Sequence, residues 1–332
     1  GFASELKALR KYPNFSNKVS HPALLQFFSY MYVPCPLSIF EDIYKLEPGC
    51  ILKINSKPPA IPPKKTLHSI SNAAITHENI TISKWYDLKQ TVENASKNMF
   101  TDIDKASDAL EEELLNVIKM QRLSDVPLGA FLSGGIDSSL IVALMQKQST
   151  KPIKTFTIGF ENPDFNEAPF AHAVARALKT DHSELLVTAS DARSVIPNLS
   201  NLYDEPFADS SQIPTYFVCK SAKQSVTVSL SGDAGDELFG GYNRYLMAPL
   251  LWKRVSWLPK IFRKVIGRLA ILIPISTWDY LIELYSKLFK KGTIFNQFGD
   301  KVHKFGTRLL EVNNEDDLFL HQIPYLNELL DY

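Results

Sequence analysis

The chain has 332 residues, which is long enough for two domains and a sizeable core. Lys plus Arg and Asp plus Glu each number 36, so the formal net charge is zero. A balanced chain lacks the electrostatic signature of a protein that binds nucleic acid or an anionic membrane, and we expect neither partner.

Cysteine usage and hydropathy are typical of a cytoplasmic protein. Cys35, Cys50 and Cys219 are odd in number, far apart and not in a CxxC pair, which argues against a disulfide framework or a structural zinc site. The most apolar run, at 269–275, is too short to span a bilayer, which takes about 20 residues. Because basic residues precede this run, we favour a core helix with a solvated basic face over a membrane-surface helix.

The first 86 residues differ in composition and periodicity from the rest of the chain. The proline-rich strip at 57–65 predicts an extended surface loop, and the polar stretch at 87–104 is interpreted as a linker. From 105 onwards, helical and strand periodicities alternate. The predicted elements are helix 105–122, strand 127–132, helix 138–148, strand 153–158, helix 167–178, strand 183–187, helix 213–223 and strand 226–230.

This alternation predicts an α/β fold with a doubly wound parallel sheet, followed beyond 245 by a helical part. Parallel sheets of this kind bind ligands outside the carboxyl ends of their strands. The turns that follow the predicted strands are therefore the first places to look for a site.

The turn SGGIDSS at 133–139 joins the strand 127–132 to the next helix. Backbone N–H groups and the helix dipole favour an anion there, two glycines permit its close approach, and three hydroxyls add donors. These residues are Gly134, Gly135, Ser133, Ser138 and Ser139. A Walker A loop would carry a Lys beside its Ser or Thr, so its absence points away from γ-phosphate chemistry and towards pyrophosphate. Asp137 would repel phosphate unless a cation lay between them, and we assign it to Mg²⁺. The alternative is a turn that only caps a helix.

Two more segments carry candidate residues. The turn SGDAGDELFGGY at 231–242 follows the last predicted strand, and its Asp236 is the candidate for a second Mg²⁺ ligand. The segment YDEPFADSSQIPTY at 203–216 precedes a predicted helix, so its serines either cap that helix or face a substrate. Its candidate acceptor-site residues are Asp204, Glu205, Asp209 and Ser210.

Together these segments resemble the synthetase half of the glutamine-dependent asparagine synthetases. The SGGxDS loop is the signature of the wider N-type ATP pyrophosphatases, and SGxxxDExFGGY at 231–242 is typical of the asparagine synthetase branch. The runs FASELKAL at 2–9 and YVPCPLSIF at 32–40 are similar to the end of that family's glutaminase domain. The resemblance spans 2–245 and implies a glutaminase remnant at 1–86, a linker at 87–104 and an adenine nucleotide alpha hydrolase-like synthetase domain at 105–332.

The resemblance also implies a reaction. Such enzymes adenylate the side-chain carboxylate of aspartate with ATP and Mg²⁺, release pyrophosphate, and form asparagine with ammonia taken from glutamine. It implies that the adenosine part is held by Leu132, Ile158, Ser231 and Gly232, and that Mg²⁺ is held by Asp137 and Asp236. Asp233 stands where many members carry a Glu that is thought to assist ammonia attack. A homodimer is a further expectation.

Three departures from the family pattern keep alternatives open. The chain begins at Gly1 without the N-terminal Cys nucleophile of the glutaminase, and it stops at Tyr332 before a Lys-Val-Asp-Arg-like motif. We therefore expect a chain truncated at both ends, with ammonia-only turnover or none. The segment 203–216 also lacks the Arg that many members place near aspartate. The alternatives are amidation of another carboxylate, such as a sugar acid, and a catalytically incomplete protein that binds nucleotide.

Overall fold

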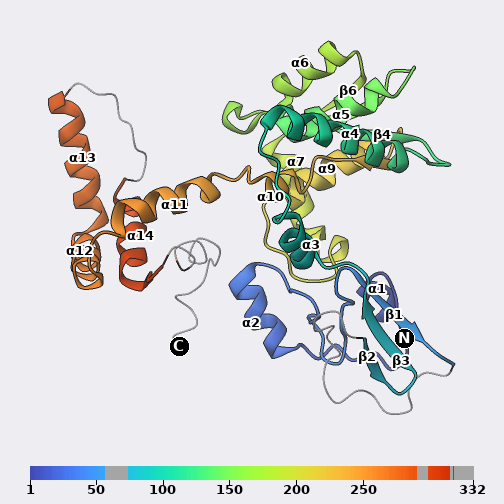
Figure 1. The fold of residues 1–332 in the computed structure, drawn as a ribbon, viewed down its shortest axis with the longest axis horizontal. Coiled ribbons are helices and arrows are strands. Elements are labelled where there is room, and N and C mark those ends of the chain that lie inside the picture. The colour runs from blue at the N-terminus through green and yellow to red at the C-terminus, as the bar shows by residue number, and fades with distance from the viewer. Residues whose placement is uncertain (57–73, 290–297, 315–316, 318–332) are drawn as a thin grey trace. The chain divides into compact units, whose positions relative to one another are not determined.

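The computed structural model describes residues 1–56, 74–289, 298–314 and 317, so the proline-rich strip at 57–65 lies outside the described residues. The chain divides into two compact units, Gly1–Ala234 and Gly235–Tyr332. Both β-sheets belong to the first unit (Figure 1).

The first unit begins with an N-terminal block that has its own small core of Ala23, Val33 and Ile39. Ser20 begins helix α2, since its hydroxyl accepts the Ala23 N–H at 3.4 Å. Three strands form an antiparallel sheet in the order β1-β3-β2. The elements of this block are α1 (Leu6–Leu9), α2 (His21–Tyr30), β1 (Cys50–Ile54), β2 (Ile75–His77) and β3 (Ile80–Lys84).

The polar stretch interpreted as a linker contains a helix, α3 (Leu88–Ala95). Asp87 explains its start, because this carboxylate accepts the Gln90 N–H at 3.1 Å and forms an ion pair with Lys84 at 2.9 Å. Sequence polarity alone could not show this helix, since its short length leaves little apolar periodicity to detect.

The central sheet is parallel, with the strand order β6-β5-β4-β7. Its strands are β4 (Leu128–Phe131), β5 (Lys154–Phe160), β6 (Asp181–Val187) and β7 (Val228–Leu230). The connecting helices are α4 (Ile103–Gln121), α5 (Ile136–Lys147), α6 (Ala168–Leu178), α7 (Ala189–Val195), α8 (Leu199–Leu202) and α9 (Gln212–Ala222), with 3₁₀ turns η1 (Pro163–Phe165) and η2 (Ile196–Asn198).

Side chains alternate between two helical layers along these strands. Ala130 and Leu132 pack with helices α4, α5 and α6, whereas Phe131 and Phe156 pack with α9. Successive side chains of a strand point to opposite faces of the sheet, and here helices cover both faces. The predicted α/β fold with a doubly wound parallel sheet is therefore confirmed, and the eight elements predicted between 105 and 230 all exist within a few residues of their predicted bounds.

The second unit is helical throughout its described residues, as expected for the chain beyond 245. Its helices are α10 (Gly235–Phe239), α11 (Asn243–Val255), α12 (Lys260–Leu272), α13 (Ile275–Phe289) and α14 (Phe298–Glu311). Helices α12 and α14 cross at Gly267 and Gly306, where a Cβ on Gly267 would lie 2.6 Å from the Gly306 carbonyl oxygen. Two glycines thus let these helix backbones touch.

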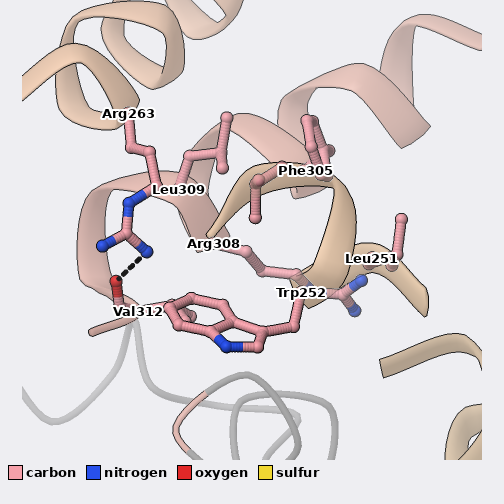
Figure 2. A pocket seen from close by; sticks show the side chains of 8 residues that line it. Leu251, Trp252, Arg263, Phe305, Arg308, Leu309 and Val312 are labelled. Carbon is pink, nitrogen blue, oxygen red and sulfur yellow. Dashed lines mark hydrogen bonds between the residues drawn. The ribbon is translucent and has the colours of Figure 1, made fainter. Parts of the chain in front are cut away.

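A small cavity lies beside this crossing, and Figure 2 shows the side chains that line it. The Arg263 guanidinium lies 4.9 Å from the ring centre of Trp252 and donates to the Val312 carbonyl at 3.5 Å. Burial lowers the pKa of Arg308, which also lines the cavity. With a volume of about 10 Å³ the cavity has room for one water molecule. It cannot hold a nucleotide.

Helix α12 corrects one expectation. Arg263 and Gly267 are its buried residues, whereas Leu269 and Leu272 of the apolar run are 56% and 80% exposed. The close glycine crossing buries Arg263 and Gly267, while Ala270 and Ile271 of the apolar run still pack on Gly306 of α14. The predicted solvated basic face is therefore wrong for Arg263, and the predicted core helix is only partly buried among the described residues. Among the described helices none is long and apolar enough by itself to cross a bilayer, although α12 and α13, bent by 90°, pass that test together.

The packing of α4 against α5 gives the first prediction. Ile118 is 2% exposed and belongs to the core beneath α5, so Ile118→Ala should lower the free energy of unfolding by about 2–5 kcal/mol. Ile103 is in the same helix but is 81% exposed, and Ile103→Ala should change it by less than about 0.5 kcal/mol. Urea titration followed by circular dichroism measures both. Equal effects would contradict this account of the core.

Candidate functional site

The strand order places the candidate site at a topological switch point. From β4 the chain moves outward to β5 and β6 on one side, and it returns to β7 on the other side. Residues 128–130 of β4 pair directly with residues 228–230 of β7. The turns 133–139 and 231–234 therefore leave neighbouring strands at the same edge, where doubly wound sheets bind their ligands.

The turn 133–139 is held by its own hydroxyl groups. The hydroxyls of Ser133 and Ser138 are 2.9 Å apart, Ser138 Oγ accepts the Ser133 N–H at 3.2 Å, and Ser133 Oγ accepts the Gly135 N–H at 3.2 Å. Helix α5 begins at Ile136 with Gly135 as its N-cap, which has no side chain to cap the first turn. The first N–H groups of a helix have no intrahelical acceptor, so this end suits an anion.

Two glycines bring neighbouring backbone against this turn. Gly134 has φ +84°, and a Cβ there would lie 2.6 Å from the Ala171 nitrogen of α6. A Cβ on Gly232, from the second turn, would lie 2.6 Å from the Ser138 nitrogen and 2.8 Å from the Asp137 carbonyl carbon. Both glycines are thus required by close contact, and Gly232 joins the two predicted turns at the start of α5.

Asp137 and Ser139 lie in the first turns of α5. Asp137 is half-buried. The Ser139 hydroxyl is buried and has no hydrogen-bond partner among the described residues. An unsatisfied buried hydroxyl is uncommon in proteins, and at a ligand site it is available to a bound group.

The second turn orients Asp233 through a neighbouring hydroxyl. Ser231 Oγ donates to the Asp233 carboxylate at 3.0 Å, and the Asp233 side chain is otherwise exposed. Ala234 follows with φ +70°, a conformation that costs a residue with a Cβ some strain. Strain at this turn accords with a functional position.

Asp236 belongs to the second unit, where it lies in the first turn of α10. Its main-chain carbonyl accepts the Gly241 N–H at 2.9 Å, and Gly241 leaves room for the carboxylate. The neighbouring Glu237 accepts a hydrogen bond from the Tyr242 hydroxyl at 2.7 Å. The approach of Asp236 to Asp137 remains a prediction.

The two side chains expected near adenosine lie on adjacent strand ends but do not meet. Leu132 is 1% exposed and packs beneath α5, while its N–H donates to the Phe156 carbonyl at 2.9 Å. Ile158 packs on the opposite face, beside Val187 and Phe217. Any contact of Leu132 with a nucleotide would therefore involve its backbone.

The segment 203–211 is only partly available to a substrate. Asp204 and Glu205 bind the N-terminal block through Lys7 and Lys45, at 3.4 and 2.6 Å. Asp209 accepts the Ser211 N–H at 2.7 Å at the start of α9, whereas the N-cap Ser211 makes no side-chain cap. The Asp209 carboxylate thus braces the turn before α9, and the Ser211 side chain does not cap this helix. Ser210 stays exposed.

The structure adds residues that the sequence did not single out. Asn166 Oδ1 accepts the N–H groups of Phe160 at 3.3 Å and Ala168 at 3.1 Å, so it ties the end of β5 to the start of α6. Asn166 lies just before a predicted helix start, and this position could have indicated its role in the sequence. The pairing of Lys45 with Glu205 joins residues 160 positions apart and left no local signal.

The described residues also form a cavity of about 450 Å³ on the α9 side of β6. It is lined by residues such as Glu184, Leu186 and Lys220, and by none of the predicted nucleotide-binding residues within the described chain.

The parallel sheet with two glycine-rich turns at its switch point defines an α/β protein of the doubly wound class. Comparison with known families agrees with this class. The asparagine synthase model matches residues 109–323, and the glutamine amidotransferase domain model matches residues 1–62. The chain belongs to the asparagine synthase family, and the resemblance of its N-terminal block to a glutaminase domain is confirmed.

Curated relatives carry the same family name. Asparagine synthetase [glutamine-hydrolyzing] 1 of Bacillus subtilis is 33% identical over 273 residues, which cover 82% of this chain and 39% of that protein. Putative asparagine synthetase [glutamine-hydrolyzing] 2 of Methanocaldococcus jannaschii is 33% identical over 81% of this chain and 48% of that protein. The chain thus spans less than half the length of these relatives.

Two solved structures are also similar. NMN synthetase from Francisella tularensis has a TM-score of 0.31 at 15% identity, covering 42% of this chain and 59% of that one. An NH₃-dependent NAD synthetase from Campylobacter jejuni has a TM-score of 0.30 at 12% identity, covering 62% and 97%. Scores this low carry no argument about the site.

Glycine substitutions test the geometry of the turn. Gly134→Ala should lower the free energy of unfolding by about 1–3 kcal/mol, because its new Cβ would meet backbone atoms of α6 at a positive φ. Gly135→Ala is the matched control, since φ there is −69° and its Cβ would meet only the Ser133 hydroxyl. Because Gly135 is the N-cap of α5, where Ala is less favourable than Gly, this change should lower the free energy of unfolding by less than about 1 kcal/mol. If thermal and urea unfolding rank the two variants in the opposite order, the turn is wrongly described.

Proposed function

We propose that this chain carries the synthetase site of an AMP-forming amide ligase that converts aspartate to asparagine. In this proposal the aspartate side-chain carboxylate attacks the α-phosphorus of ATP and pyrophosphate leaves. Ammonia then attacks the acyl carbon of the β-aspartyl-AMP intermediate, and AMP leaves. In the full-length enzyme the ammonia would come from glutamine.

One observation carries the proposal: Gly232 lies against the first turn of α5, at Asp137 and Ser138. This contact places two glycine-rich turns around one helix N-terminus at the switch point of the sheet. A helix N-terminus with its cap position empty binds phosphate oxygens through N–H groups. The unpartnered Ser139 hydroxyl supplies a further donor. The absence of a Lys in this turn favours binding of pyrophosphate over γ-phosphoryl transfer.

The acidic residues fit a magnesium ion. Mg²⁺ is bound by one or two carboxylates together with phosphate oxygens and water. Asp137 and Asp236 would hold the ion, and bound Mg²⁺ would neutralise charge on the departing pyrophosphate.

The chain's own residues would bind the pyrophosphate, and one of them would accept a proton. The N–H groups at the start of α5 would bind the pyrophosphate oxygens. Asp233, held by the Ser231 hydroxyl at 3.0 Å, would accept the proton that attacking ammonia loses. Asp is one methylene shorter than Glu. The turn 231–234 would therefore have to hold the Asp233 carboxylate close enough to the ammonia.

The acceptor remains the least constrained part of the proposal. The structure commits Asp204 and Glu205 to the N-terminal block, which leaves Asp209 and Ser210 as the candidate acceptor-site residues of this segment. Residues 203–216 contain no Arg to pair with an aspartate carboxylate. This favours keeping a second candidate, amidation of another carboxylate such as a sugar acid.

The remaining expectations belong to the same proposal. Residues 1–86 would be the later part of a glutaminase domain, 87–104 a connection that includes α3, and 105–332 the synthetase domain. The three cysteines are free thiols, which suits a reducing cytoplasm. Homodimer formation is also proposed and is measurable by sedimentation.

Asp137→Asn tests the metal assignment. It removes the charge while keeping the shape, so Mg²⁺-dependent pyrophosphate release with ammonia should fall by about 100-fold or more. Asp104→Asn is the matched control, because Asp104 also lies in a first helical turn, that of α4, and release should not change. Normal release from Asp137→Asn would contradict the assignment.

A substrate screen tests the acceptor. Pyrophosphate release is measured with ATP, Mg²⁺ and ammonia against aspartate and a set of uronic acids. The proposal predicts release that depends on aspartate, with AMP formed in equal amount. Release with uronic acids alone would support the second candidate. No release with any carboxylate, despite ATP binding, would support a catalytically incomplete nucleotide-binding protein.

A further inference from the structure

The segment 203–211 is fastened to the N-terminal block at three points. Asp204 accepts the Lys7 N–H at 3.1 Å, Glu205 accepts the Ile39 N–H at 2.7 Å, and the Ala208 N–H donates to the Met31 carbonyl at 2.9 Å. These contacts reach three separate parts of that block. A loop that follows the short helix α8 is thus shaped by residues more than 160 positions earlier in the chain.

Glu205 makes the strongest of these attachments. Its second oxygen pairs with Lys45 at 2.6 Å, and the Lys45 ammonium also donates to the Val33 carbonyl. The side chains of Glu205 and Lys45 are only 19% and 32% exposed. A shielded ion pair with additional hydrogen bonds on both partners is costly to break, because the remaining charge is left without a partner. Lys7, which pairs with Asp204, is 47% exposed and also pairs with Glu5, so that attachment is weaker.

The same segment leads to the carboxyl edge of the sheet. In a doubly wound fold the helix before a parallel strand runs against that strand, so α9 begins at the carboxyl edge and ends near the start of β7. The segment is internally braced, since Gln212 Nε2 donates to the Phe207 carbonyl at 3.2 Å and the Tyr203 hydroxyl donates to the Gln212 carbonyl at 3.3 Å. Burial raises the pKa of that hydroxyl, which keeps it a donor. These hydrogen bonds connect the two ends of the segment on either side of Asp209 and Ser210.

We infer that Glu205 is a positioning residue that, paired with Lys45, lets the N-terminal glutaminase-like block set the shape of the acceptor loop 203–211. That the loop binds the acceptor rests on the proposed function, whereas the attachment of the loop to the N-terminal block does not. It means that the N-terminal block acts on the proposed acceptor site through an ion pair. Loosening the ion pair should weaken binding of the acceptor carboxylate and leave binding of the nucleotide unchanged.

Hydrogen exchange tests the attachment without any turnover. In the full 332-residue chain, Lys45→Met keeps the side-chain length and removes the charge, and Glu205→Gln removes the opposite charge. Each should raise amide exchange about tenfold in both 31–45 and 203–211, and the double variant should add little to either single one. Lys18→Met is the control, since Lys18 pairs with Glu41 at 2.7 Å inside the N-terminal block and should leave 203–211 unchanged.

Kinetics test the direction of the effect. For pyrophosphate release, Glu205→Gln and Lys45→Met should raise the KM for the carboxylate about tenfold while the KM for ATP stays within about twofold, and Lys45→Arg should restore it. Equal rises in both KM values, or exchange that increases on one side only, would overturn the inference. No release from the unmodified chain would contradict the proposed function, and hydrogen exchange would then decide the attachment alone.

Discussion

The contact between Gly232 and the first turn of α5 is the constraint on which the rest of the site depends. There is no room for a side chain at this point, because a Cβ would lie 2.6 Å from the Ser138 nitrogen. The contact exists because β4 and β7 are neighbours, and they are neighbours because the chain reverses direction across the sheet after β6. A helix N-terminus that is free of a side-chain cap and bordered by a second glycine turn has the features of an anion site.

The chemistry in the proposal follows from what surrounds that contact. Hydroxyl groups keep the turn 133–139 in shape, and Ser231 holds Asp233 beside it. The loop 203–211 reaches the same edge of the sheet but takes its shape from the N-terminal block through Glu205 and Lys45. In the proposal the nucleotide part is built within the sheet, whereas the acceptor part is shared with a second piece of the chain.

Local pattern was enough to predict the sheet, its helices and the two glycine turns, because buried parallel strands and glycine contacts leave a signal in adjacent residues. Helix α3 escaped prediction because it is short and leaves little apolar periodicity, although Asp87 at its start is a local N-cap signal. The burial of α12 was predicted wrongly in part, because the glycine crossing buries Arg263 and leaves Leu269 and Leu272 exposed. The partners of Asp204 and Glu205 lie far away in sequence, and no local pattern records an ion pair of that kind.

The central claim is that the turn 133–139 binds pyrophosphate, and backbone amide NMR tests it most directly. Inorganic pyrophosphate with Mg²⁺ is titrated into the chain while the ¹H–¹⁵N signals are followed. The account predicts that the largest saturable shifts fall at 134–139 and 231–233, where N–H groups face the anion. Shifts that concentrate elsewhere, or no saturable shift in these turns, would contradict it.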